Sequence, residues 1–118
     1  MLWHDIASID DLVADSGVCA LVENTQIALF YIPQEPAAVF AINNYDPIGD
    51  ANVLSRGIIG SMQNALVVAS PLYKQHFCLQ TGQCIEQSDV CVATYPVKIE
   101  NDRVFVQAQV CAEQTSAA

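Results

Sequence analysis

Short apolar runs, broken by turn residues about every ten positions, constrain the fold of this chain more than any other feature. Residues 26–32 form one such run, and Pro33 ends it because proline cannot donate to a strand ladder. Val104 and Val106 alternate with polar neighbours, as in a strand with one buried face. We therefore predict an all-β protein, an antiparallel sandwich or barrel of short strands.

The expected elements follow from this pattern. Strands are expected at residues 18–22, 26–32, 38–42, 58–59, 65–69, 75–79, 83–85, 95–100 and 103–110. Ser8 and Asp11 have the spacing of a capping box, which predicts at most one short helical turn near residues 8–14. Gly17 is expected to reverse the chain into the first hairpin. The polar segment 43–56 is expected to be an irregular, exposed loop.

The chain is long enough for one domain and too short for two. Its 118 residues contain no repeat and no composition shift before the small, polar C-terminal residues. We predict a single domain over residues 1–112 and a frayed tail at 113–118.

Charge and cysteine content exclude several classes of partner. Thirteen acidic residues against four basic ones give a net charge of −9, which repels nucleic acids and anionic membrane surfaces. No signal peptide and no membrane span are expected, so we expect a cytoplasmic protein. The five cysteines are an odd number, which favours free thiols in a reducing compartment. Cys19, in an apolar run, is expected in the core.

Few side chains are arranged for catalysis or metal binding. The two histidines, His4 and His76, have no readable nucleophile beside them. A zinc site would draw on His76, Cys78, Cys84 and Cys91, but five and six residues separate the cysteines, whereas zinc knuckles place ligands closer together. Packed thiols are the simpler interpretation. Asp46 and Asp50 could act as an acid–base pair, although acids in a loop are usually only solvated.

Three segments carry a family resemblance: residues 39–48, residues 54–57 with the pattern Leu-x-x-Gly, and residues 68–82 with Ser-Pro-x-Tyr, a Phe strand and Thr-Gly. Together they resemble a Rieske-type iron–sulfur domain, in which Cys-Pro-His and Cys-Pro-x-His loops hold the cluster. Asp46 and Ile48 stand at the first pair of ligand positions, and Ser70 and Tyr73 at the second. The resemblance therefore implies the fold without the metal.

The likeness extends to residues 3–12, 17–21 and 53–57, and it is to the small subunits of cytosolic NAD(P)H-dependent nitrite reductases. This resemblance implies an accessory, non-catalytic subunit in the assimilatory reduction of nitrite to ammonium. It places FAD, siroheme and an iron–sulfur cluster on the large subunit, which is the implied partner. It implies no cofactor on this chain, since side chains alone do not supply the redox states of this reaction.

In this family the two loops meet at one end of the domain, where an interface with the large subunit is expected. The residues expected there are Asp46, Pro47, Ile48, Arg56, Leu72, Tyr73 and Lys74. Three alternatives remain open. In the first, Ile48 and Tyr73 only fill the space of the lost cluster. In the second, the chain is a stand-alone module that binds a small ligand in that space. In the third, it is an electron carrier, which iron and visible absorbance would reveal.

Overall fold

A computed structural model describes residues 3–107, and it confirms an all-β chain of short antiparallel strands. In chain order the elements are β1 (Trp3–Ser8), η1 (Ile9–Asp11), β2 (Ser16–Val22), β3 (Thr25–Tyr31), β4 (Val39–Asn43), β5 (Tyr45–Asp46), β6 (Ala51–Asn52), η2 (Leu54–Arg56), β7 (Ile58–Met62), β8 (Ala65–Ala69), β9 (His76–Cys78), β10 (Thr94–Tyr95), β11 (Val97–Glu100) and β12 (Arg103–Gln107). The two η elements are single 3-10 turns. Among the described residues, no helix is long and apolar enough to cross a membrane.

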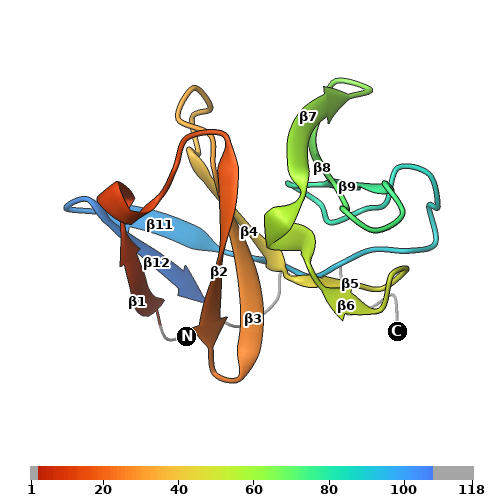
Figure 1. The fold of residues 1–118 in the computed structure, drawn as a ribbon. Coiled ribbons are helices and arrows are strands. Elements are labelled where there is room, and N and C mark those ends of the chain that lie inside the picture. Colours follow the sequence, from red (N-terminus) through yellow and green to blue (C-terminus); the bar gives the residue numbers. More distant parts are fainter. Residues whose placement is uncertain (1–2, 108–118) are drawn as a thin grey trace.

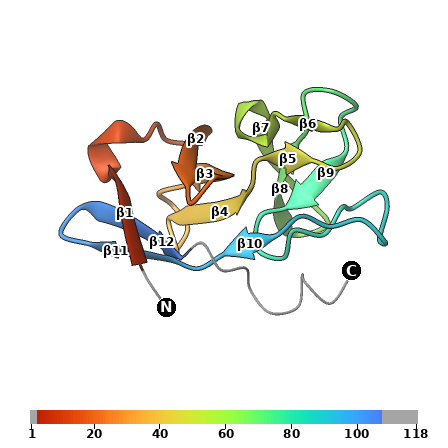
Figure 2. The same ribbon diagram turned by 90° about the horizontal axis from the view of Figure 1, so that it is seen from below.

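The strands form three main layers. The sheet β10-β4-β3-β2 lies in the middle, β1-β12-β11 lies on one side, and β7-β8-β9 lies on the other (Figure 1). The short pair β5-β6 lies with β7–β9, away from β1, β11 and β12 (Figure 2). Each gap between layers holds its own apolar cluster.

β3 shows how the middle sheet supports both clusters. Its residues from Ile27 to Phe30 are all buried. Because side chains alternate across a strand, Ile27 and Leu29 enter the cluster with Val104 and Val106, while Ala28 and Phe30 enter the cluster around Phe77. A continuous apolar run is the expected sequence of a strand covered on both faces.

Three tight hairpins appear where turns are expected. Residues 23–24, 63–64 and 101–102 each have two successive positive φ angles, from 49° to 66°, which is the backbone of a type I′ turn. Each pair contains asparagine, which tolerates this conformation better than most residues. The strands expected on either side of these turns therefore pair as the hairpins β2–β3, β7–β8 and β11–β12.

Several local expectations are wrong. In the segment 83–85, Gln83 and Cys84 form isolated bridges and there is no strand. The expected strand 95–100 is divided at Pro96 into β10, in the middle sheet, and β11, in an outer sheet, because proline has no N–H to continue a ladder. β1 was not expected, although it pairs along β12. The capping box of η1 is confirmed, with Asp11 and Ser8 bonding each other's backbone. The tail 113–118, the boundary at 112 and residues 108–110 lie outside the described part.

Gly17 and Cys19 also differ from expectation, because β2 runs straight through them. A Cβ on Gly17 would lie 2.6 Å from the backbone oxygen of Ser55 and 2.7 Å from the ring of Phe30, so this glycine permits a close approach rather than a reversal. Cys19 is exposed, since Val18, Ala20 and Val22 take the inward positions of the strand.

We expect Gly82→Ala to lower the free energy of unfolding by about 2 kcal/mol. Gly82 has φ +79°, and an added Cβ would lie 2.0 Å from the backbone oxygen of Val92. Urea denaturation followed by circular dichroism measures the change. The control is Gly60→Ala, because no atom lies within 4 Å of the Cβ position there. Equal effects of the two substitutions would contradict this explanation.

Candidate functional site

A buried hydrogen bond joins the two loops that the sequence analysis brings together. Loop 1 is defined here as residues 44–50 and loop 2 as residues 70–75. Asp46 and Ser70 are both 0% exposed, and the hydroxyl of Ser70 donates to Oδ2 of Asp46 at 2.5 Å. These are the residues that the resemblance places at the first ligand position of each loop. A direct side-chain contact thus connects the loops where a Rieske-type domain would connect them through metal.

Both side chains also shape their own loops. Oδ1 of Asp46 accepts hydrogen bonds from the backbone N–H groups of Ile48 at 2.8 Å and Gly49 at 3.0 Å. Oγ of Ser70 accepts from the N–H of Leu72 at 3.3 Å. Gly49 lets the loops pack, because a Cβ there would lie 2.5 Å from Cδ1 of Leu72. The pair therefore determines the conformation of each loop as well as their contact.

Asn44, which the sequence analysis did not single out, anchors the start of loop 1. Its amide donates to Oε1 of Gln26 at 3.0 Å, and its Oδ1 accepts from the N–H of Ser55 at 2.7 Å. Asn44 is buried, and Leu54 in η2 is fully buried, so the expectation of an irregular, exposed loop over residues 43–56 is wrong. The sequence signal for this role of Asn44 is its position as a polar residue directly after the strand that ends at Asn43.

The outer side of the two loops presents five residues that we call the loop tip: Pro47, Ile48, Leu72, Tyr73 and Lys74. Pro47 and Lys74 are exposed, Leu72 is 44% exposed and Tyr73 is 66% exposed. Ile48 is half-buried and packs against the apolar cluster, so it does occupy interior space, whereas Tyr73 does not. The loop tip is thus an accessible, mainly apolar surface with one cation.

The other two residues of the expected interface lie differently. The Asp46 side chain is fully buried, so a partner cannot touch it and its role is to hold the loops. Arg56 is exposed, but it belongs to η2, which packs against β2 and β3, and not to either loop. Asp46 and Asp50 do not form an acid–base pair either, because Asp50 is exposed and accepts a hydrogen bond from Tyr45.

The donor set at the four ligand positions that the resemblance implies does not fit a [2Fe-2S] cluster of the Rieske type. Such a cluster takes two thiolates and two imidazoles. Both oxygens of Asp46 already accept hydrogen bonds, the hydroxyl of Ser70 is a donor to one of them, and Ile48 has no lone pair. The described cysteines, at positions 19, 78, 84 and 91, all lie outside the loops.

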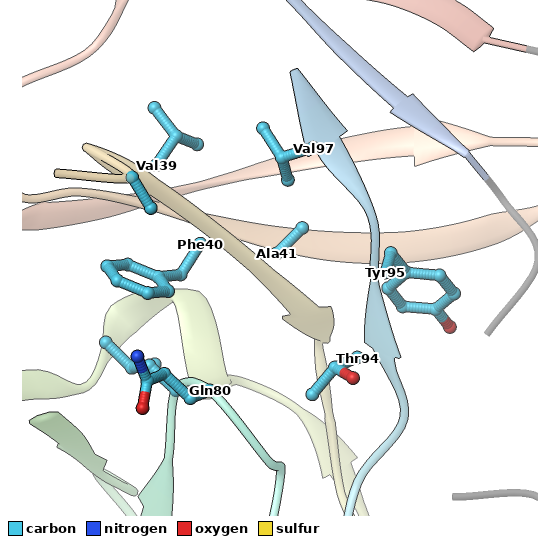
Figure 3. A pocket seen from close by; sticks show the side chains of 9 residues that line it. Val39, Phe40, Ala41, Gln80, Thr94, Tyr95 and Val97 are labelled. Atoms are coloured by element: carbon cyan, nitrogen blue, oxygen red, sulfur yellow. The ribbon is translucent and has the colours of Figure 1, made fainter. Parts of the chain in front are cut away.

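Two cavities in the described part of the chain lie beside the loops rather than between them. One of about 270 Å³ lies between β4, β10 and β11, where Gln80 and Thr94 add polar groups to apolar walls (Figure 3). Another of about 330 Å³ touches loop 1 only at Tyr45 and Pro47. Neither includes a residue of loop 2. Asp46 and Ser70 themselves occupy the junction that the binding-module alternative requires to be open.

Two of the four zinc candidates, His76 and Cys84, form a hydrogen-bonded clamp with Glu86. Glu86 accepts from the backbone N–H of His76 at 2.8 Å, and its other oxygen lies 2.5 Å from Nδ1 of the same histidine. The thiol of Cys84 also points at Glu86. Over residues 3–107, no three side chains of metal-ligating type gather into a site. The clamp holds the segment after β9 against that strand.

This clamp predicts a loss of stability in acid. Burial alone raises the pKa of Glu86, but the hydrogen bonds from His76 outweigh it, so the pKa lies below the ordinary value of 4.5. Glu86 therefore stabilises the fold fully above pH 4.5, and this contribution is lost as the pH falls through the folded pKa. Urea midpoints of the wild type and Glu86→Gln should converge as the pH is lowered below 4.5. Glu100→Gln, at an exposed pair with Lys98, is the control. A difference independent of pH would contradict the prediction.

Comparison with known proteins agrees with the geometry. Residues 2–107 match the family model described as "Rieske-like [2Fe-2S] domain". The chain is 44% identical to the nitrite reductase (NADH) small subunit of Escherichia coli K12, over 84% of this chain and 91% of that protein. The solution structure of the E. coli protein NirD superimposes with a TM-score of 0.82 at 40% identity, covering 92% of this chain and 98% of that one.

A further relative is a longer protein. The large subunit of the nitrite reductase [NAD(P)H] of Klebsiella oxytoca is 37% identical over 107 residues, which are 91% of this chain and 11% of that protein. The family is shown by the model that matches residues 2–107 and by the 44% identity to the E. coli small subunit over 91% of that protein. The chain is a member of the Rieske-like domain family and, within it, belongs with the small subunits of NADH-dependent nitrite reductase.

Proposed function

We propose that this chain is the non-catalytic small subunit of a cytoplasmic NAD(P)H-dependent nitrite reductase and that it docks its loop tip on the large subunit. The large subunit would carry FAD, siroheme and an iron–sulfur cluster and would perform the chemistry. The observation that carries the proposal is that the Asp46–Ser70 bond keeps the two loops together without metal and leaves Leu72 and Tyr73 exposed. Exposed aromatic and aliphatic groups at the centre of a surface are typical of interfaces.

The Klebsiella relative supports a direct partnership. That protein is named as a large subunit, and 11% of its length resembles this chain. A domain of this kind is therefore part of the same polypeptide as the remainder of that large subunit. Covalent linkage gives one copy of each part and a high effective concentration between them. We infer the same one-to-one pairing when the two parts are separate chains.

Charge supports the loop tip as the contact. Four basic residues are present in a chain of net charge −9. Arg103 pairs with Asp5 at 2.8 Å and Lys98 with Glu100 at 3.5 Å. Lys74 and Arg56 have no ion pair among the described residues and are free to meet acidic groups on a partner.

The proposal is tested by mixing the purified large subunit with increasing amounts of this chain. Co-purification at one to one and a rise in nitrite-dependent NAD(P)H oxidation that saturates at that ratio are expected. The chain alone should be colourless and inactive. Lack of any complex would refute docking, and iron with visible absorbance in the isolated chain would instead support the electron-carrier alternative.

Lys74 offers a test that separates binding from stability. Its φ of 67° is unfavourable for lysine and acceptable for glycine. We expect Lys74→Gly to raise the free energy of unfolding by about 0.5 kcal/mol, because strain is relieved, and to weaken the complex several-fold. Urea denaturation and calorimetric titration with the large subunit measure the two effects. Unchanged affinity would mean that Lys74 does not contact the partner.

A further inference from the structure

We propose that the outer edge of β7 pairs with β7 of a second copy of this chain, which would join the two outer sheets into one continuous sheet. In the order β7-β8-β9, no described strand pairs with the outer side of β7. Natural edge strands are usually blunted by charges, proline or bulges. Residues 57–65 carry no charge and no proline, and β7 pairs with β8 without a bulge. This edge is therefore open to another strand.

The backbone pattern shows which groups are available. Met62 and Ala65 flank the two-residue turn of the β7–β8 hairpin and form a hydrogen-bonded pair. Because bonding alternates along an antiparallel strand, Met62, Gly60 and Ile58 direct their backbone groups to β8. Ile59 and Ser61 consequently direct theirs outward, and no described backbone group bonds to them there.

These outward groups select one register. If two copies lie antiparallel with Gly60 opposite Gly60, Ile59 of each copy faces Ser61 of the other, and both residues exchange backbone hydrogen bonds. A shift toward the start of β7 would use the N–H of Gly57, which already donates to the oxygen of Leu54 at 3.0 Å. A shift the other way would use Gln63 in the turn. The symmetric register uses every outward group in the strand.

Side chains favour the same arrangement. Ile58 is 74% exposed and would lie opposite Met62 of the second copy, so the contact covers two apolar groups on each side of the axis. Both residues line a shallow cavity of about 230 Å³, and no atom lies within 4 Å of the Cβ position of Gly60. Nothing in the described strand obstructs the approach of the second backbone.

The charges beside the outer strands favour β7 over β2 as the edge where two copies pair. β2 is another outer strand, but Asp15 and Glu23 flank it, and antiparallel pairing of two copies would place these acids opposite each other. β7 is flanked by the uncharged Gly57 and Gln63, and in the symmetric register Arg56 would lie opposite Asn64 rather than an acid. The net charge of −9 on each copy still opposes association, so added salt should strengthen it. β9 is bridged to residue 84, which prevents further growth at the other edge.

Sedimentation equilibrium of the full chain tests the proposal. A reversible dimer is expected to appear between about 10 μM and about 1 mM protein, as for a small interface, and to increase in about 0.5 M NaCl. Ile58→Lys should abolish it. Leu21→Lys, on β2 with a similar exposure of 69%, should not. A monomer throughout this range, or a dimer lost with Leu21→Lys instead, would overturn the proposal.

Cross-linking tests the register. Opposed residues of a non-hydrogen-bonded pair have Cα atoms about 4.5 Å apart, within reach of a disulfide. Gly60→Cys should therefore form a linked dimer on mild oxidation, and Ile58→Cys should not, because it lies opposite Met62. The wild type gives the background from the exposed Cys19. Equal linking by both variants would overturn the symmetric register. None of these outcomes depends on the large subunit.

Discussion

Asp46→Ala is expected to lower the free energy of unfolding by about 4 kcal/mol. The carboxylate is fully buried and accepts from the Ser70 hydroxyl and from the N–H groups of Ile48 and Gly49. Alanine would leave these donors buried without an acceptor and would open a space between the loops. Urea denaturation followed by circular dichroism gives the value.

The matched comparison is between two single variants, Asp46→Asn and Asp50→Asn, in their free energy of unfolding. Both changes remove one charge from loop 1, but only Asp46 is buried. Asparagine at 46 keeps an acceptor for the backbone N–H groups and should cost about 1–2 kcal/mol, whereas asparagine at 50 should cost less than about 0.5 kcal/mol. Similar losses at the two positions would mean that the contact with Ser70 contributes little.

The sequence was sufficient for the parts of the fold that depend on local pattern. The I′ hairpins follow from asparagine-containing turns, and the both-face burial of β3 is visible in the run from Ile27 to Phe30. The sequence was insufficient where a segment forms a strand only because it pairs with a strand that is distant in the chain. β1 is a strand because it pairs with β12, about a hundred residues later in the chain. The local sequence pattern of β1 does not indicate this pairing.

The candidate site divides in the same way. The resemblance identifies Asp46 and Ser70 only as positions where cluster ligands are missing. Their residue types argue against a metal cluster and say nothing more about their role. Their hydrogen bond depends on the fold, which brings Oγ of Ser70 within 2.5 Å of Oδ2 of Asp46 although the two residues are 24 positions apart in the sequence. A buried carboxylate and an exposed one have the same letter in the sequence, so the sequence alone places Asp46 at the surface. Burial, and not residue type, distinguishes Asp46 and Ser70, which hold the loops together, from the exposed residues of the loop tip.

Tyr73→Ala and Leu72→Ala are each expected to weaken binding to the large subunit about 30-fold, the loss that corresponds to about 2 kcal/mol at an interface hot spot. Tyr73 is 66% exposed in the free chain, so its truncation should leave the free energy of unfolding unchanged within about 0.5 kcal/mol. Leu72→Ala should cost about 1 kcal/mol, because Leu72 packs against Gly49. Lys74→Glu should also weaken the complex, mainly by slowing association, and its effect should shrink in high salt. Calorimetric and surface-binding measurements with the large subunit provide both quantities.

Leu21→Ala is the matched control for these truncations. Leu21 is 69% exposed, close to the 66% of Tyr73, but it lies on β2, outside both loops. If exposure alone determined the effect, Leu21→Ala and Tyr73→Ala would weaken the complex equally, and the loop tip would have no special role. If the loop tip is the contact, only Tyr73→Ala raises the amount of this chain needed to saturate nitrite-dependent NAD(P)H oxidation. Asp46→Asn should produce a smaller rise in the same titration, because a less firmly joined pair of loops must be ordered when the partner binds.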